Sequence, residues 1–174
     1  MTDSGSQTQI ETTDREIIAT RVYDAPRDLV FKLWTDPQHL TQWWGPRGFT
    51  TTTFSMDVKP GGVWRFVMHG PDGTDYENKI TYVTVDAPKK LVYKHGGDKT
   101  EPVNFEVAVT FDDMADGKTK LHMRMTFPSP AAKDFPSSAY FLIGYKPVEL
   151  KTAATKKFQA DLKKYAGELK LTER

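Results

Sequence analysis

Hydrophobic and polar residues alternate along much of the region from residue 15 to residue 127, and this alternation predicts an antiparallel β-sheet. Turn-forming residues, among them Gly61-Gly62, separate the alternating runs. Because successive side chains of a strand point to opposite faces, we expect one face of the sheet to be buried and the other to contact water. The predicted strands are Arg15–Tyr23, Phe49–Val58, Val63–His69, Tyr76–Val85, Leu91–Lys94, Val103–Phe111 and Leu121–Phe127.

Two short helices are predicted between the first strand and the second. Pro26 suits the first turn of a helix, because its missing N–H would have no partner there. Asp36 can accept hydrogen bonds from free N–H groups at the start of the second helix, which ends at Gly45-Pro46. Two helices this close together must fold back over neighbouring strands. Their apolar residues are Leu29, Val30, Leu33, Trp34, Leu40, Trp43 and Trp44.

A long amphipathic helix is predicted from Pro147 onward. At about 20 residues it would be about 30 Å long, enough to cross a whole sheet. Its lysines fall mostly off the apolar stripe and are interleaved with acidic residues, so we interpret them as a solvated face with ion pairs. An acidic partner, such as the surface of a chaperone, is the alternative. The stripe consists of Val148, Thr155, Phe158, Leu162, Tyr165 and Leu169.

These elements predict one α+β domain over residues 15–170, with helices on one face of the sheet. The chain has 174 residues, which is long enough for a single hydrophobic core. Residues 1–14 are polar and lack the basic and apolar regions of a signal peptide, so we expect a disordered tail there.

Composition narrows the classes of function. The net charge is +1, which argues against a dedicated nucleic-acid-binding protein. The chain has no cysteine, so disulfides, thiolate metal sites and a cysteine nucleophile are excluded. No apolar run approaches the roughly 20 residues that a membrane span needs. We therefore expect a cytoplasmic protein without a nucleic-acid partner, a membrane span or a cofactor.

The histidines form no predicted metal site. They are His39, His69, His95 and His122, and they lie in separate segments without metal-ligand spacing to one another or to a carboxylate. We expect surface histidines or histidines with satisfied hydrogen bonds. A catalytic pair of His69 with Asp75 or Glu77 across a hairpin is geometrically possible, but the sequence has no G-x-S-x-G motif. The sequence therefore favours a protein that is not an enzyme and leaves an enzyme open.

The strand over residues 63–69 has two unlike faces. Trp64, Phe66 and Met68 share one face, and we expect this more apolar set to point inward. With the opposite parity, Arg65 and His69 would point inward and could bind a carboxylate. The leading alternative to ligand contact is that this inward set only fills the core, since any half-buried sheet needs an apolar face.

Four segments resemble the family of activators of heat-shock protein 90 ATPase, within the START-like or SRPBCC superfamily. They are VYDAPRDLVFKLWTDPQHLTQWWGP, the Gly-Gly turn before VWRFVMHGPDG, KKLVY, and the predicted final helix. The resemblance covers roughly Arg15 to Leu169. It implies a helix-grip fold, in which a curved antiparallel sheet wraps around the long C-terminal helix and leaves a deep cavity between them.

The resemblance and the apolar strand faces together predict a small-molecule-binding protein, as a monomer or a homodimer. The ligand would be an apolar, aromatic or lipid-like molecule with a small polar end. A co-chaperone that contacts a heat-shock ATPase and a cyclase or hydrolase that uses the cavity are the alternatives. The Trp43-Trp44 pair could form a gate to the cavity or could simply pack in the core and over the sheet edge. The expected cavity residues are Trp43, Trp44, Trp64, Phe66, Met68, Ile80, Tyr82, Tyr93, Phe105, Phe141, Thr155 and Phe158.

Overall fold

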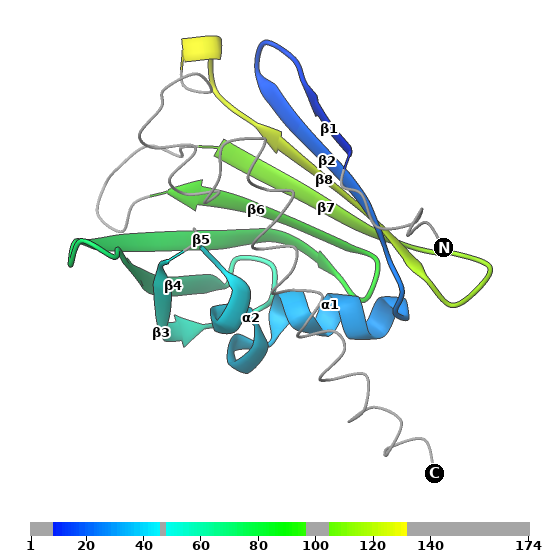
Figure 1. Ribbon diagram of the computed structural model, residues 1–174, viewed down its shortest axis with the longest axis horizontal. Helices are drawn as coiled ribbons and strands as arrows, with labels where there is room; N and C mark the ends of the chain where they lie inside the picture. The colour runs from blue at the N-terminus through cyan, green and yellow to red at the C-terminus, as the bar shows by residue number, and fades with distance from the viewer. Residues whose placement is uncertain (1–8, 46–47, 97–104, 132–174) are drawn as a thin grey trace.

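The computed structural model of the protein describes residues 9–45, 48–96 and 105–131. They form one curved antiparallel sheet with two α-helices on one side of it (Figure 1). The order of the eight strands across the sheet is β1-β2-β8-β7-β6-β5-β4-β3. The elements are β1 (Gln9–Thr12), β2 (Glu16–Tyr23), α1 (Arg27–Thr35), α2 (Pro37–Trp43), β3 (Thr50–Met56), β4 (Val63–His69), β5 (Asp75–Asp86), β6 (Lys90–Gly96), β7 (Phe105–Asp113) and β8 (Thr119–Thr126).

The strands from β3 to β8 form a meander in which each strand pairs with the next one along the chain. Short turns suffice for such antiparallel neighbours. Strand β2 then pairs with β8, so β2 and β3 lie far apart in the sheet. The helices α1 and α2 carry the chain between them (Figure 1). The predicted strands and both short helices are confirmed, with ends that differ by a few residues.

Strand β1 corrects part of the predicted disordered tail. Gln9–Thr12 pair antiparallel with β2, with Gln9 opposite Thr20. A tight turn joins the two strands, in which the Thr13 N–H donates to the carbonyl of Glu16 at 3.0 Å. The free edge of β2 offers unpaired backbone groups, which can bind another strand whatever its side chains are. A polar segment without hydrophobic alternation can therefore form a strand here.

Local capping explains where the helices begin. The Asp36 carboxylate accepts a hydrogen bond from the Gln38 N–H at 2.9 Å, and Pro37 is the first residue of α2. Such a bond satisfies one of the N–H groups that have no partner within the helix. Pro26 occupies the position just before α1 and not a position inside its first turn.

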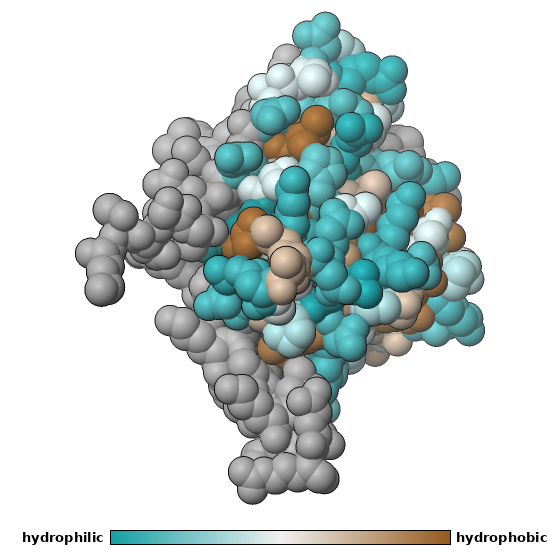
Figure 2. Space-filling model, turned by 90° about the vertical axis from the view of Figure 1, so that its right-hand side faces the viewer, coloured by the Kyte–Doolittle hydropathy of each residue, from teal (hydrophilic) through white to brown (hydrophobic). Residues whose placement is uncertain are grey.

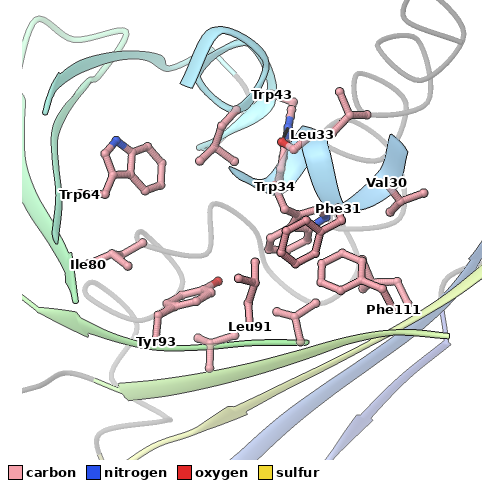
Figure 3. Packing of buried hydrophobic residues seen from close by; sticks show 14 of the residues in the cluster. Val30, Phe31, Leu33, Trp34, Trp43, Trp64, Ile80, Leu91, Tyr93 and Phe111 are labelled. Atoms are coloured by element: carbon pink, nitrogen blue, oxygen red, sulfur yellow. Dashed lines mark hydrogen bonds between the residues drawn. The ribbon is translucent and has the colours of Figure 1, made fainter. Parts of the chain in front are cut away.

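The face of the sheet against which α1 and α2 pack is called the inner face here (Figure 3). On β7, Val107 and Val109 lie on this face and are almost completely buried, at 1% and 0% exposed. Glu106, the residue just before Val107, points to the other face and is exposed. Phe31 and Trp34 of α1 contact Phe111 of β7, with ring centroids 5.3 and 6.1 Å away. The hydrophobic residues that alternate with polar ones in the sequence are thus the residues that point to the buried face of the sheet.

The Gly61-Gly62 turn joins β3 to β4 and is also held by β5. The Gly61 N–H donates to the carbonyl of Tyr82 at 2.8 Å, and the Tyr82 N–H donates to the carbonyl of Gly62 at 2.9 Å. Gly61 has a φ of +79°, and a Cβ at Gly62 would lie 2.0 Å from the Asp57 carbonyl oxygen. Both positions therefore require glycine.

The predicted C-terminal helix, from Pro147 onward, lies outside the described residues. In the ranges that are described, neither helix is long and apolar enough to cross a membrane.

Candidate functional site

The candidate site lies on the inner face, where four neighbouring strands place their side chains in one row. Trp64 of β4 is opposite Ile80 of β5, Ile80 is opposite His95 of β6, and His95 is opposite Phe105 of β7. All four side chains are buried. Strand pairing thus brings together residues that are as far as 41 positions apart in the chain.

Aromatic rings form a continuous group at one end of this row. Trp64 and Phe66 stack with centroids 4.0 Å apart. The ring of Trp44, at the end of α2, packs edge-on against both, at 5.0 Å from Trp64 and 6.1 Å from Phe66. Such arrangements are favourable beyond the area that they bury. Trp44, Trp64 and Phe66 are called the aromatic cluster below.

The two adjacent tryptophans have different environments. Trp43 is buried, its indole N–H donates to the carbonyl of Leu33 at 3.0 Å, and its ring lies 5.0 Å from that of Trp34. Trp44 is only half-buried as a residue, although its Nε1 atom is buried and has no hydrogen-bond partner among the described residues. One tryptophan therefore packs in the core, while the other packs over β4 and has an indole N–H without a partner in the described part of the chain.

His95 is the most unusual polar residue of the inner face. It is 1% exposed, and its imidazole stacks on the Phe105 ring with centroids 4.9 Å apart and an angle of 17° between the planes. Phe66 contacts it edge-on at 6.2 Å. Within the described part of the chain neither ring nitrogen has a hydrogen-bond partner. Burial lowers the pKa of His95 to about 3, so the imidazole is neutral at pH 7.

Two tyrosines lie beside His95 on the same face. Tyr82 of β5 is opposite Tyr93 of β6, and their rings meet edge-on at 6.3 Å. Burial raises the pKa of both phenols, and the proximity of Tyr82 adds to the effect on Tyr93. Both side chains are therefore neutral groups that can donate and accept hydrogen bonds.

The structure brings most of the predicted cavity residues onto one face. Their contact with a ligand stays a prediction. Those on the inner face or over it are Trp43, Trp44, Trp64, Phe66, Met68, Ile80, Tyr82, Tyr93 and Phe105. The predicted residues Phe141, Thr155 and Phe158 lie outside the described residues.

Sequence reasoning missed His95, which was grouped with surface or satisfied histidines. The predicted strand ended at Lys94, whereas β6 continues to Gly96. The signal was present, because Leu91, Tyr93 and His95 are spaced by two and are all buried. The predicted strand Leu91–Lys94 leaves out His95, which is the next inward-facing residue of β6.

The other histidines do have partners. His39 lies 3.8 Å from the Asp36 carboxylate, and the Nδ1 atom of His122 lies 2.9 Å from the Thr20 hydroxyl. His69 forms hydrogen bonds with Asp75 and Thr52. The described residues contain no group of three or more His, Asp or Glu side chains that could hold a metal ion.

Of the two pairs that the sequence left possible, His69 with Asp75 is present, and it lies on the outer face. His69 Nδ1 is 2.7 Å from the Asp75 carboxylate, and His69 Nε2 is 2.8 Å from the Thr52 hydroxyl. Trp64, Phe66 and Met68 occupy the inner face, so the alternative that pointed Arg65 and His69 inward is wrong. The Thr52–His69–Asp75 network is exposed and is separated from the aromatic cluster by the sheet.

An open depression of about 570 Å³ lies at the turn between β1 and β2. It is lined by Thr13, Asp14, Arg15, Glu16 and Thr126. Ligand sites for apolar molecules are usually enclosed and lined mainly by hydrophobic and aromatic side chains, whereas this depression is open to solvent and lined by polar and charged residues. This depression is therefore not the predicted cavity.

Comparison with known proteins places the chain in a family. The model of the family described as Activator of Hsp90 ATPase homolog 1-like protein matches residues 24–140. A search of curated proteins found no match.

Several solved structures share the fold. A crystal structure from Mycobacterium smegmatis is 23% identical with a TM-score of 0.72, over 88% of this chain and 95% of that one. A solution structure from Arthrobacter aurescens is 20% identical with a TM-score of 0.74, over 90% and 91%. A crystal structure from Nitrosomonas europaea is 17% identical with a TM-score of 0.73, over 90% and 99%.

Proposed function

The chain belongs to the family of Activator of Hsp90 ATPase homolog 1-like proteins, and from this premise we propose that it binds an apolar small molecule on the inner face of its sheet. The aromatic cluster is the observation that carries the proposal. Trp44 packs over Trp64 and Phe66 but is itself only half-buried. A flat apolar molecule could pack on such rings with little rearrangement.

The position of the cluster supports the proposal. It lies next to a row of buried side chains from β5, β6 and β7, and the helices α1 and α2 lie along one part of the sheet (Figure 1). In a helix-grip fold, the predicted C-terminal helix would cover the remainder of the face and close the site. The ligand would then be held between that helix and the aromatic cluster.

The co-chaperone alternative rests on the family description and has less support from the surface. Among the described residues, the large hydrophobic side chains that are exposed are Phe54, Val83 and Met114, on three different elements or turns. Figure 2 shows one side of the molecule, on which hydrophobic residues lie in small groups between hydrophilic ones. Protein-binding surfaces more often carry one contiguous apolar patch.

Native mass spectrometry of the purified protein tests the proposal first. A co-purifying small molecule, released on denaturation, would identify the ligand directly. In parallel, the fluorescence of the neutral probe N-phenyl-1-naphthylamine would be titrated against the protein. We expect saturable binding of the probe to one site.

Two variants locate the probe. Trp44→Ala should weaken its binding about tenfold or more, because the ring that packs on it is lost. Phe54→Ala is the matched control, since Phe54 is also aromatic but is 70% exposed on β3. Equal binding by wild type, Trp44→Ala and Phe54→Ala would contradict the proposed site, and no saturable binding would contradict the function.

A further inference from the structure

Two polar side chains with buried nitrogens, Trp44 and His95, each pack edge-on against the ring of Phe66. The centroid of Phe66 is 6.1 Å from the Trp44 ring and 6.2 Å from the His95 imidazole. The Trp44 Nε1 atom and both His95 ring nitrogens are buried without a hydrogen-bond partner among the described residues. Buried polar atoms are almost always paired, because an unpaired one has lost its hydrogen bonds to water.

We propose that His95 binds the polar end of the ligand and that this end is an uncharged hydroxyl group. The inference rests on the proposed function, and it names the chemical class of the ligand. The aromatic cluster would hold the apolar body of the molecule. The hydroxyl group would lie at the His95 imidazole, whose nitrogens are buried without a partner among the described residues.

The hydrogen-bonding capacity of His95 favours a hydroxyl group. A neutral imidazole has one N–H donor and one nitrogen acceptor. A hydroxyl group can donate to the acceptor nitrogen or accept from the N–H, whereas a carboxylate can only accept. An uncharged hydroxyl group therefore fits the neutral imidazole of His95.

The charges around His95 argue against an anionic ligand. The residues directly opposite it on the neighbouring strands are Ile80 and Phe105. Among the described residues, the buried arginine of the inner face is Arg21, which lies opposite Leu121, and Leu121 lies opposite Phe111. Phe105 and Phe111 are separated by six residues of β7, or about 20 Å at 3.4 Å per residue. Arg21 is therefore too far away to neutralise a carboxylate at His95.

Three ligands of similar shape test the proposal on the wild-type protein. They are 2-naphthol, 2-methylnaphthalene and 2-naphthoate, each measured by displacement of N-phenyl-1-naphthylamine. We expect 2-naphthol to bind about tenfold more tightly than the other two, since one good hydrogen bond in a buried site has about this effect. Equal affinities for 2-naphthol and 2-methylnaphthalene would overturn the proposal, and so would tighter binding of 2-naphthoate.

Variants of His95 assign the preference to this residue. His95→Phe keeps a ring that can stack on Phe105 but removes both nitrogens, so we expect it to bind 2-naphthol and 2-methylnaphthalene equally. His95→Gln retains a donor and an acceptor and should keep part of the preference. His122→Phe is the control, because His122 lies on the outer face. A hydroxyl preference that survives in His95→Phe would overturn the role of His95.

The same data separate this inference from the proposed function. If the probe and all three naphthalenes fail to bind, then the proposed function is wrong and the inference fails with it. If they bind to a site that Trp44→Ala weakens but show no hydroxyl preference, then the proposed function stands. In that case the inference about His95 is wrong.

Discussion

The imidazole of His95 stacks on the ring of Phe105, with centroids 4.9 Å apart and an angle of 17° between the planes. The two residues lie directly opposite each other on β6 and β7. His95 is therefore packed in the manner of an aromatic core residue, although its nitrogens are polar. This arrangement has a measurable consequence for stability as a function of pH.

The stability of the protein should fall in mild acid because of His95. Its pKa is lowered from 6.5 to about 3 by burial, so below pH 6.5 the unfolded chain binds a proton that the folded chain does not. The contribution is present in full above pH 6.5 and is lost as the pH falls towards 3. The slope is at most about 1.4 kcal/mol per pH unit. Urea unfolding of wild type and His95→Phe between pH 4.5 and 7 measures it. Parallel curves for the two proteins would show that His95 is not buried in its neutral form.

Trp43 and Trp44 should respond differently to the same substitution. Trp43→Phe removes the hydrogen bond from the indole N–H to the Leu33 carbonyl and leaves a small cavity, so we expect a loss of about 2 kcal/mol in the free energy of unfolding. Trp44→Phe replaces a half-buried indole, whose Nε1 has no described partner, by a smaller ring and should cost less, about 1 kcal/mol. Chemical denaturation of both variants makes the comparison. Equal losses would mean that the two indoles have equivalent environments.

Gly62→Ala should destabilise the fold more than Gly73→Ala does. A Cβ at Gly62 would lie 2.0 Å from the backbone oxygen of Asp57, and the turn cannot shift without breaking its bonds to Tyr82. We expect a loss of more than about 2 kcal/mol at Gly62. Gly73 has a positive φ, of +83°, but has open space around it, and its substitution should cost about 1 kcal/mol. Thermal unfolding tests the order of the two variants, and the reverse order would contradict the described turn.

Asp75→Asn should leave the stability nearly unchanged. The contact between His69 and Asp75 is short, but both side chains are well exposed, at 37% and 63%. Exposed ion pairs contribute little because water and salt screen them. We expect a change of less than about 1 kcal/mol in urea unfolding, and no change in binding of N-phenyl-1-naphthylamine. A large effect on probe binding would move the functional site to the outer face.

The sequence was sufficient to predict the strands from β2 to β8, and for β4 it favoured the face that is buried. Val107, Val109 and Phe111 show why, because their spacing of two along β7 is a direct consequence of strand geometry. The start of α2 could equally be predicted from the sequence, since Asp36 and Pro37 act on backbone groups only a few residues away. Strand β1 could not be predicted from the sequence, because its pairing depends on backbone groups of β2 and not on its own side chains.

The contacts within the candidate site depend on the tertiary structure and not on local sequence. Sequence alone determined the apolar strand faces, the turns and the family resemblance, because these depend on local periodicity and on nearby residues. Only the tertiary structure decided that His95 lies between Ile80 and Phe105 and that Trp44, and not Trp43, packs over Phe66. Such neighbours come from strand register and from the path of α2 across the sheet. Whether a polar atom finds a partner is likewise a property of its surroundings in space, and no spacing along the chain contains it.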